Sequence, residues 1–131
     1  MSGRQLLAVD VGTQSVRAIV FDANGRLLAK AQLPLDPPYH SPQPGWAEQD
    51  AETYWNAIAA ACNELWRHGE VRPQDIAGLS LTTLRSTVVC ADESGRPLRP
   101  AIVWLDQRKA DRLPPLGPLW NSAFALAGAG G

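Results

Sequence analysis

The chain has 131 residues, enough for one domain with a hydrophobic core and too few for two domains of ordinary size. Hydrophobic residues make up 45% of it and charged residues 19%, a balance that excludes a chain disordered throughout. Twelve basic and thirteen acidic side chains leave a net charge of -1, so the chain lacks the strong positive charge typical of nucleic-acid-binding proteins. We therefore expect no nucleic-acid partner.

The N-terminus and the cysteines indicate the cellular compartment in which the protein is expected. The first apolar run extends only from Leu6 to Val9 before Asp10 interrupts it, which is shorter than a signal-peptide core or a membrane span. Cys62 and Cys90 lie far apart and lack the spacing of a metal or redox site. We expect a cytoplasmic protein with reduced thiols and no membrane association.

The first 35 residues predict three consecutive antiparallel strands. Residues 5–11 and 16–22 are apolar runs rich in β-branched side chains, joined by a tight turn. Residues 22–25 are a strong turn signal, after which residues 26–35 can pair back as a third strand. A proline-rich loop over residues 36–46 follows.

The next segment predicts a long amphipathic helix over residues 51–67. Asp50 is a suitable N-cap, and Gly69 is placed to end the helix. Apolar residues recur at the spacing of one helical face. They are Trp55, Ile58, Ala59, Cys62, Leu65 and Trp66. This face predicts that Trp55 and Trp66 belong to the core.

The remaining segments predict further strands and an irregular end. Residues 76–84 and 86–92 have strand character, and a third short apolar segment leads to Trp104. Residues 106–113 are compatible with the start of a helix, which Pro114 stops. We expect an α/β fold of order βββαββ with a mixed sheet, forming one unit over residues 1–113. Residues 114–131 are expected to form an irregular end rich in glycine, alanine and proline.

The segment DVGTQSVR, residues 10–17, is the most informative for function. It joins two strands, and a glycine-rich turn in that place can direct backbone N–H groups toward phosphate oxygens. Gly12 allows a close approach of the backbone, and the hydroxyls of Thr13 and Ser15 add donors. The segment therefore predicts phosphate binding.

Two charged residues of the same segment extend this hypothesis. Asp10 ends a hydrophobic strand, where its carboxylate can hold Mg²⁺ directly or through water. Arg17 can pair with phosphate charge. The alternative interpretation is that these residues form an ordinary hairpin turn with polar side chains on its surface.

Four segments together resemble a known family. The pattern DxGTxxxR at residues 10–17 resembles the first phosphate motif of actin-like ATPases. PGWAEQD (44–50), TTLRSTVV (82–89) and AIVWLDQR (101–108) resemble segments of the FGGY carbohydrate kinases, glycerol kinases among them, and occur in the family's order. The resemblance covers residues 5–112. It implies the ribonuclease-H-like half domain of the actin-like ATPase fold, truncated relative to the family.

The resemblance also implies a function, the transfer of the γ-phosphoryl group of ATP to a hydroxyl of a small-molecule sugar or polyol, with ATP and Mg²⁺ as cofactors. The residues that face the phosphates would be Asp10, Gly12, Thr13, Gln14, Ser15 and Arg17, with Asp10 also facing the metal. The residues that face the acceptor would be Arg85, Ser86, Trp104 and Asp106.

The resemblance places the catalytic aspartate and the adenosine pocket beyond the chain end. We therefore assign no catalytic residue within the chain and expect little or no turnover from it alone. Exposed strand edges of an incomplete domain favour self-association, for example as a homodimer.

Two departures from the family bear on the substrate. Ser86 stands where glycerol kinases carry a glutamate, which favours another polyol or a sugar over glycerol. The GQMHG-like segment of xylulokinases does not occur at this position, which disfavours that subgroup.

Other classes of function remain as alternatives. The strand order with Asp10 at a strand end also describes a metal-dependent ribonuclease-H-like nuclease, in which Glu52 would be a second acid, although no third is evident. A non-catalytic actin-like assembly domain is a further alternative, against which the PGW and AIVW segments argue. A dinucleotide-binding fold is disfavoured because the first turn joins two strands and lacks GxGxxG.

Overall fold

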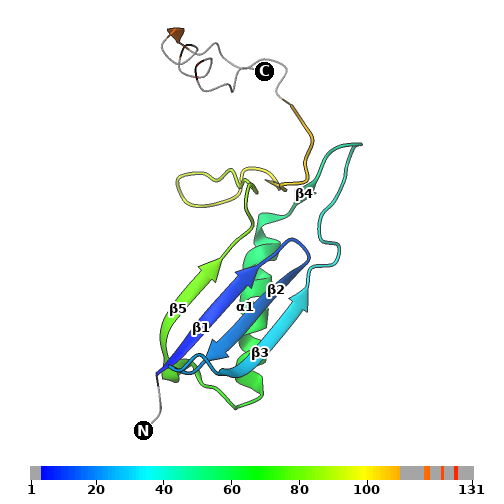
Figure 1. The fold of residues 1–131 in the computed structure, drawn as a ribbon. Helices are drawn as coiled ribbons and strands as arrows, with labels where there is room; N and C mark the ends of the chain where they lie inside the picture. Colours follow the sequence, from blue (N-terminus) through cyan, green and yellow to red (C-terminus); the bar gives the residue numbers. More distant parts are fainter. Residues whose placement is uncertain (1–3, 110–116, 119–121, 123–125, 127–131) are drawn as a thin grey trace.

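The main body of the protein is a four-stranded sheet with one long helix against one face (Figure 1). The computed structural model describes residues 4–109, 117–118, 122 and 126. Strands β1 (Gln5–Val11), β2 (Ser15–Phe21) and β3 (Leu27–Pro34) form the predicted antiparallel meander, and β5 (Ile76–Thr82) pairs in parallel with β1. The order is β3-β2-β1-β5, so the predicted α/β fold with a mixed sheet is confirmed.

The helix connects the meander to the parallel strand. Helix α1 (Ala51–Arg67) has the predicted bounds, and the Asp50 carboxylate accepts a hydrogen bond from the backbone N–H of Glu52 at 3.0 Å. Gly69, with φ of +71°, follows the helix end in the left-handed region that glycine adopts without strain. The 3₁₀-helix η1 (Pro73–Asp75) then leads into β5. A parallel pair needs such a crossover, and α1 supplies it.

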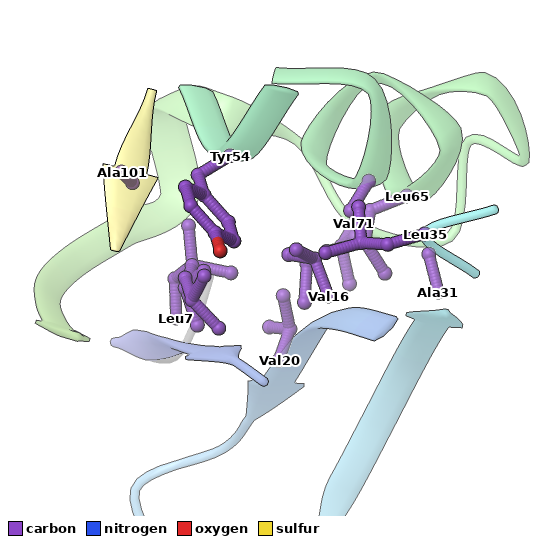
Figure 2. Close-up of a cluster of buried hydrophobic side chains, with 13 residues drawn as sticks. Leu7, Val16, Val20, Ala31, Leu35, Tyr54, Leu65, Val71 and Ala101 are labelled. Carbon is purple, nitrogen blue, oxygen red and sulfur yellow. The ribbon is translucent and has the colours of Figure 1, made fainter. Parts of the chain in front are cut away.

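The core lies between α1 and the sheet. Figure 2 shows Tyr54 and Leu65 of the helix pointing toward strand residues that include Leu7, Val16 and Val20. Val16 and Val20 are fully buried, as is Ala61, whose small side chain lets the helix approach the sheet closely.

The prediction that Trp55 lies in the core is wrong. Tyr54 faces the sheet instead, so the buried face of α1 is rotated by about one residue, and Trp55 is 66% exposed. Trp66 is partly buried against the core, as predicted. Spacing alone did not fix the rotation because apolar residues flank the buried face on both sides.

The predicted strand over residues 86–92 is also wrong. The described structure has only isolated bridges there, Val88 with Ile102 and Ala91 with Pro97. Ser86 has a φ of +60°, which interrupts an extended backbone. The preceding strand ends at Thr82 rather than residue 84, because β1, its pairing partner, turns back at Gly12.

The structure also has a small second sheet, formed by two short strands outside residues 86–92. Strand β4 (Glu48–Gln49) pairs antiparallel with β6 (Ala101–Ile102). This pairing joins the segment after the proline-rich loop to the segment before Trp104. The predicted helix start at residue 106 is wrong for residues 106–109, which are irregular. Residues 110–113 lie outside the described part of the chain, as does most of the predicted irregular end over residues 114–131. No helix in the described residues has the length and apolar character needed to cross a membrane.

We predict that Leu65→Ala lowers the free energy of unfolding by about 2 to 5 kcal/mol, because it leaves a cavity between α1 and the sheet. Leu79→Ala is the matched control, since Leu79 is 64% exposed, and it should change the free energy by no more than about 0.5 kcal/mol. Urea unfolding followed by circular dichroism measures both. Equal effects of the two substitutions would contradict this position of the core.

Candidate functional site

The candidate site lies at the edge of the sheet where β1 and β5 end. These strands are parallel, and Asp10, the penultimate residue of β1, is the direct register partner of Thr82, the last residue of β5. The Thr82 hydroxyl donates to one oxygen of the Asp10 carboxylate at 3.0 Å, and Arg17 Nη1 donates to the other at 2.8 Å. The Asp10 side chain is thereby oriented while remaining 47% exposed.

The turn between β1 and β2 is tight and requires glycine. The backbone N–H of Gly12 donates to the carbonyl of Ser15 at 3.0 Å, and a Cβ at Gly12 would lie 3.2 Å from that same oxygen. The carbonyl of Gln14 accepts from the N–H of Leu35 at 2.8 Å, which ties the turn to the start of the proline-rich loop. Ser15 is buried and its hydroxyl accepts from Gln32 Nε2 on β3 at 3.2 Å, and its predicted contact with phosphate stays a prediction.

Trp104 connects this turn to a segment more than ninety residues away in the sequence. Its indole Nε1 donates to the hydroxyl oxygen of Thr13 at 2.9 Å, and its side chain is otherwise 54% exposed. The indole therefore lies beside the β1–β2 turn, and about half of the residue's surface remains accessible to solvent.

Two hollows adjoin this indole. The first has a volume of about 420 Å³ and is lined by Asp10, Val11, Gly12, Thr13, Thr83, Leu84, Arg85, Ser86 and Trp104. The second has a volume of about 340 Å³ and is lined by Gly12, Thr13, Gln14, Ser15, Arg17, Pro38, Tyr39, Trp104 and Leu105. Gly12, Thr13 and Trp104 belong to both hollows. All the residues predicted to face phosphate or acceptor, except Asp106, therefore line one or other of two neighbouring hollows.

The first hollow contains the predicted acceptor residues Arg85, Ser86 and Trp104. Arg85 and Ser86 form the turn that follows β5, where Ser86 has a left-handed backbone, and this turn and the β1–β2 turn both line the first hollow. Arg85 is exposed and has no hydrogen-bond or ion-pair partner among the described residues. Its guanidinium donors are therefore available to a ligand.

Asp106 lies apart from the two hollows. Its carboxylate accepts from the backbone N–H of Ala47 at 2.8 Å and from Arg108 Nε at 2.8 Å, and its side chain is only 5% exposed. Hydrogen bonds from the Arg108 side chain are the main reason why the pKa of Asp106 lies far below its usual value, although burial acts in the opposite direction. These contacts are structural, and the predicted contact of Asp106 with the acceptor stays a prediction.

Sequence reasoning missed Thr82, Thr83 and Tyr39. Thr82 orients Asp10, Thr83 lines the first hollow and Tyr39 lines the second. The role of Thr82 follows from the parallel register of β1 with β5, which no local pattern reveals. Tyr39 lies in the proline-rich loop, where its aromatic side chain was the only sequence feature that could have indicated a binding residue.

Comparisons with known proteins agree with this arrangement. Residues 5–117 match the family model described as the FGGY family of carbohydrate kinases, N-terminal domain. The chain belongs to the FGGY family of carbohydrate kinases. The resemblance stated from the four sequence segments is thereby confirmed.

Relatives of known sequence and structure lead to the same family. The glycerol kinase of Ligilactobacillus salivarius is 38% identical over 112 residues, which cover 85% of this chain and 22% of that protein. The structure of a xylulose kinase from Rhodospirillum rubrum matches with a TM-score of 0.72 and 34% identity, over 82% of this chain and 22% of that one. A Plasmodium falciparum glycerol kinase with ADP matches with a TM-score of 0.66 and 26% identity, over 79% of this chain and 21% of that one.

The FGGY chain thus spans about a fifth of the length of the relatives it matches. Its ribonuclease-H-like, actin-like fold is the one expected from the sequence. The comparisons do not favour the nuclease or assembly alternatives, and Glu52, the second acid of the nuclease hypothesis, lies in the first turn of α1 and lines neither hollow.

We predict that the ionised Asp106 makes the folded chain sensitive to acid. Because its pKa is lower in the folded than in the unfolded state, its stabilising effect is complete above the unfolded value and is lost as the pH falls toward the folded value. The free energy of unfolding should therefore fall between about pH 5 and about pH 2, and more steeply than in Asp106→Asn.

Urea unfolding at a series of pH values measures this difference. The pKa of Asp92 is also lowered, mainly by a hydrogen bond from the Ser94 side chain, but it contributes equally to both proteins. Parallel pH profiles for the wild type and Asp106→Asn would contradict the prediction.

Proposed function

We propose that the chain is the N-terminal part of an ATP-dependent sugar or polyol kinase, which binds phosphate at the β1–β2 turn and the acceptor in the first hollow. The hydrogen bond from Trp104 Nε1 to Thr13 is the observation that carries this proposal, because it makes the turn and the acceptor segment walls of one region. Kinases of glycerol and xylulose among the relatives support a small-molecule acceptor.

The charges at the turn support phosphate binding. Only Nη1 of the Arg17 guanidinium is engaged by Asp10, so the other nitrogens have donors left for phosphate oxygens. Gly12 keeps the backbone of the turn open to close approach, and the likeness to a glycerol kinase with ADP supports a nucleotide as a ligand.

Asp10 suits a magnesium ion brought in with the nucleotide. Mg²⁺ is usually held by one or two carboxylates together with substrate phosphates and several waters. The half-exposed Asp10 carboxylate can supply such a ligand directly or through water, and its two hydrogen bonds hold it in place. A bound magnesium ion would neutralise part of the phosphate charge.

The acceptor would lie against Trp104 with Arg85 beside it. The indole offers an apolar face to the C–H groups of a sugar or polyol, and the free guanidinium of Arg85 can donate to its hydroxyls. Ser86 provides a hydroxyl in place of a carboxylate, so we propose an acceptor other than glycerol.

Phosphoryl transfer from this arrangement would be in line. The acceptor hydroxyl oxygen bonds to the γ-phosphorus as the bond from that phosphorus to the β-phosphate oxygen breaks, and ADP leaves. We propose that the hydroxyl proton passes to a carboxylate other than Asp10, because Asp10, the one carboxylate among the described residues that line the first hollow, already accepts two hydrogen bonds. The catalytic aspartate expected beyond the chain end stays a prediction. The residues of this chain contribute orientation and charge stabilisation.

We also propose that residues 1–113 form the N-terminal part of the kinase's first domain and residues 114–131 an irregular end. A cytoplasmic location, self-association as a homodimer, and the absence of nucleic-acid and membrane partners stay predictions.

We predict that the chain binds MgADP in a magnesium-dependent manner and that Arg17→Met weakens this binding by about tenfold or more, as expected for a lost charge-assisted hydrogen bond. Asp10→Asn should abolish the magnesium dependence. Isothermal titration calorimetry with and without EDTA measures both effects.

Arg67→Met is the matched control, since Arg67 lies in the last turn of α1, away from both hollows. It should bind MgADP like the wild type. The proposal fails if the chain shows no magnesium-dependent binding at millimolar nucleotide, or if Arg67→Met and Arg17→Met have equal effects.

A further inference from the structure

The turn that carries Trp104 is fixed at both ends by a single residue. Residues 103–106 form this turn, closed by a hydrogen bond from the Asp106 N–H to the Val103 carbonyl at 2.8 Å. The Val103 N–H donates to the carbonyl of Ala47 at 2.9 Å, and the Ala47 N–H donates to the Asp106 carboxylate at 2.8 Å. The two backbone groups of Ala47 therefore hold the first and last residues of the turn.

A buried group of charges holds Asp106 in this position. Arg108 is ion-paired with Asp106, and its Nη1 also donates to Glu48 Oε1 at 2.8 Å. The Arg108 guanidinium lies over the Trp46 ring, 4.1 Å from its centroid. The Glu48 and Arg108 side chains are both largely buried, so removal of Arg108 would leave two buried carboxylates with less compensation.

This group lies apart from the main hydrophobic core. Ala47 and Val103 are buried, but neither belongs to the cluster between α1 and the sheet. Loss of the charges should consequently disturb the Trp104 turn before it disturbs the sheet. A purely stabilising role for the group would instead lower the stability of the whole chain.

We propose that Arg108 is a positioning residue for Trp104 and that it acts through its ion pairs with Asp106 and Glu48. The ion pairs hold the turn against Ala47, and the turn holds the indole where its Nε1 reaches Thr13. The position of the indole sets the shared wall of the two hollows, and with it the orientation of an acceptor. The part concerning the acceptor rests on the proposed function, whereas the position of Trp104 does not.

The experiment uses ¹⁹F NMR of the chain labelled with 5-fluorotryptophan. Trp104→Phe assigns the Trp104 signal, and Thr13→Val shows how that signal responds to loss of its hydrogen bond. We expect Arg108→Met to move the Trp104 signal in the same direction as Thr13→Val. The signals of Trp55 and Trp66 on α1 should remain unchanged.

Arg99→Met is the matched control. Arg99 Nη2 donates to the same Glu48 oxygen at 2.8 Å but does not contact the 103–106 turn, so its loss should leave the Trp104 signal in place. Asp106→Asn, which retains an oxygen to accept from Ala47, should move the signal less than Asp106→Ala. Equal shifts in these two variants would contradict a role for the hydrogen bond between Asp106 and Ala47.

Titration with glycerol, a pentitol and a ketopentose, followed through the Trp104 signal, tests the consequence for the acceptor. Arg108→Met should weaken binding of the best of these by about tenfold to about a hundredfold, and Arg99→Met should leave it nearly unchanged.

The positioning role is overturned if Arg108→Met leaves the Trp104 signal unmoved, if Arg99→Met moves it equally, or if the Trp55 and Trp66 signals change together with it. A Trp104 signal that moves as expected, in a chain whose wild type binds none of the three compounds, supports the positioning role and overturns the proposed acceptor site.

Discussion

The position of β1 between an antiparallel neighbour, β2, and a parallel neighbour, β5, is the constraint on which the site depends. The antiparallel pair places the β1–β2 turn at one edge of the sheet, and the parallel pair brings the end of β5 to that same edge. Asp10 is therefore held from both sides, by Arg17 and by Thr82. The buried residues of β1, β2 and β3, packed against α1, stabilise this arrangement.

The second half of the site depends on hydrogen bonds and ion pairs more than on the hydrophobic core. Ala47, between the proline-rich loop and α1, fixes the turn that carries Trp104. The predicted PGW and AIVW segments thus have a physical connection, since the first supplies Ala47 and the second supplies the turn. The bond from Trp104 to Thr13 then joins this peripheral structure to the edge of the sheet.

Much of the fold and the site could be predicted from the sequence where the signals are local. Apolar runs rich in β-branched residues, separated by turn signals, predicted the meander, and the Asp50 cap with Gly69 predicted both ends of α1. Contacts distant in sequence could not be predicted this way. The register that pairs Asp10 with Thr82, the ion pair that encloses Asp106 and the rotation that exposes Trp55 depend on how elements pack. Residues 86–92 have strand-forming side chains, but their pairing with β6 is limited to an isolated bridge between Val88 and Ile102.

The central claim is that the β1–β2 turn and the Trp104 segment form one site for a nucleotide and an acceptor. Amide NMR titration of the chain, first with MgADP and then with a pentitol or ketopentose, tests it most directly. The account predicts that MgADP shifts the amides of residues 12–17, that the acceptor shifts those of Arg85, Ser86 and Trp104, and that the Thr13 amide responds to both. Shifts confined to α1 and β3, or a Thr13 amide that responds to neither, would contradict it.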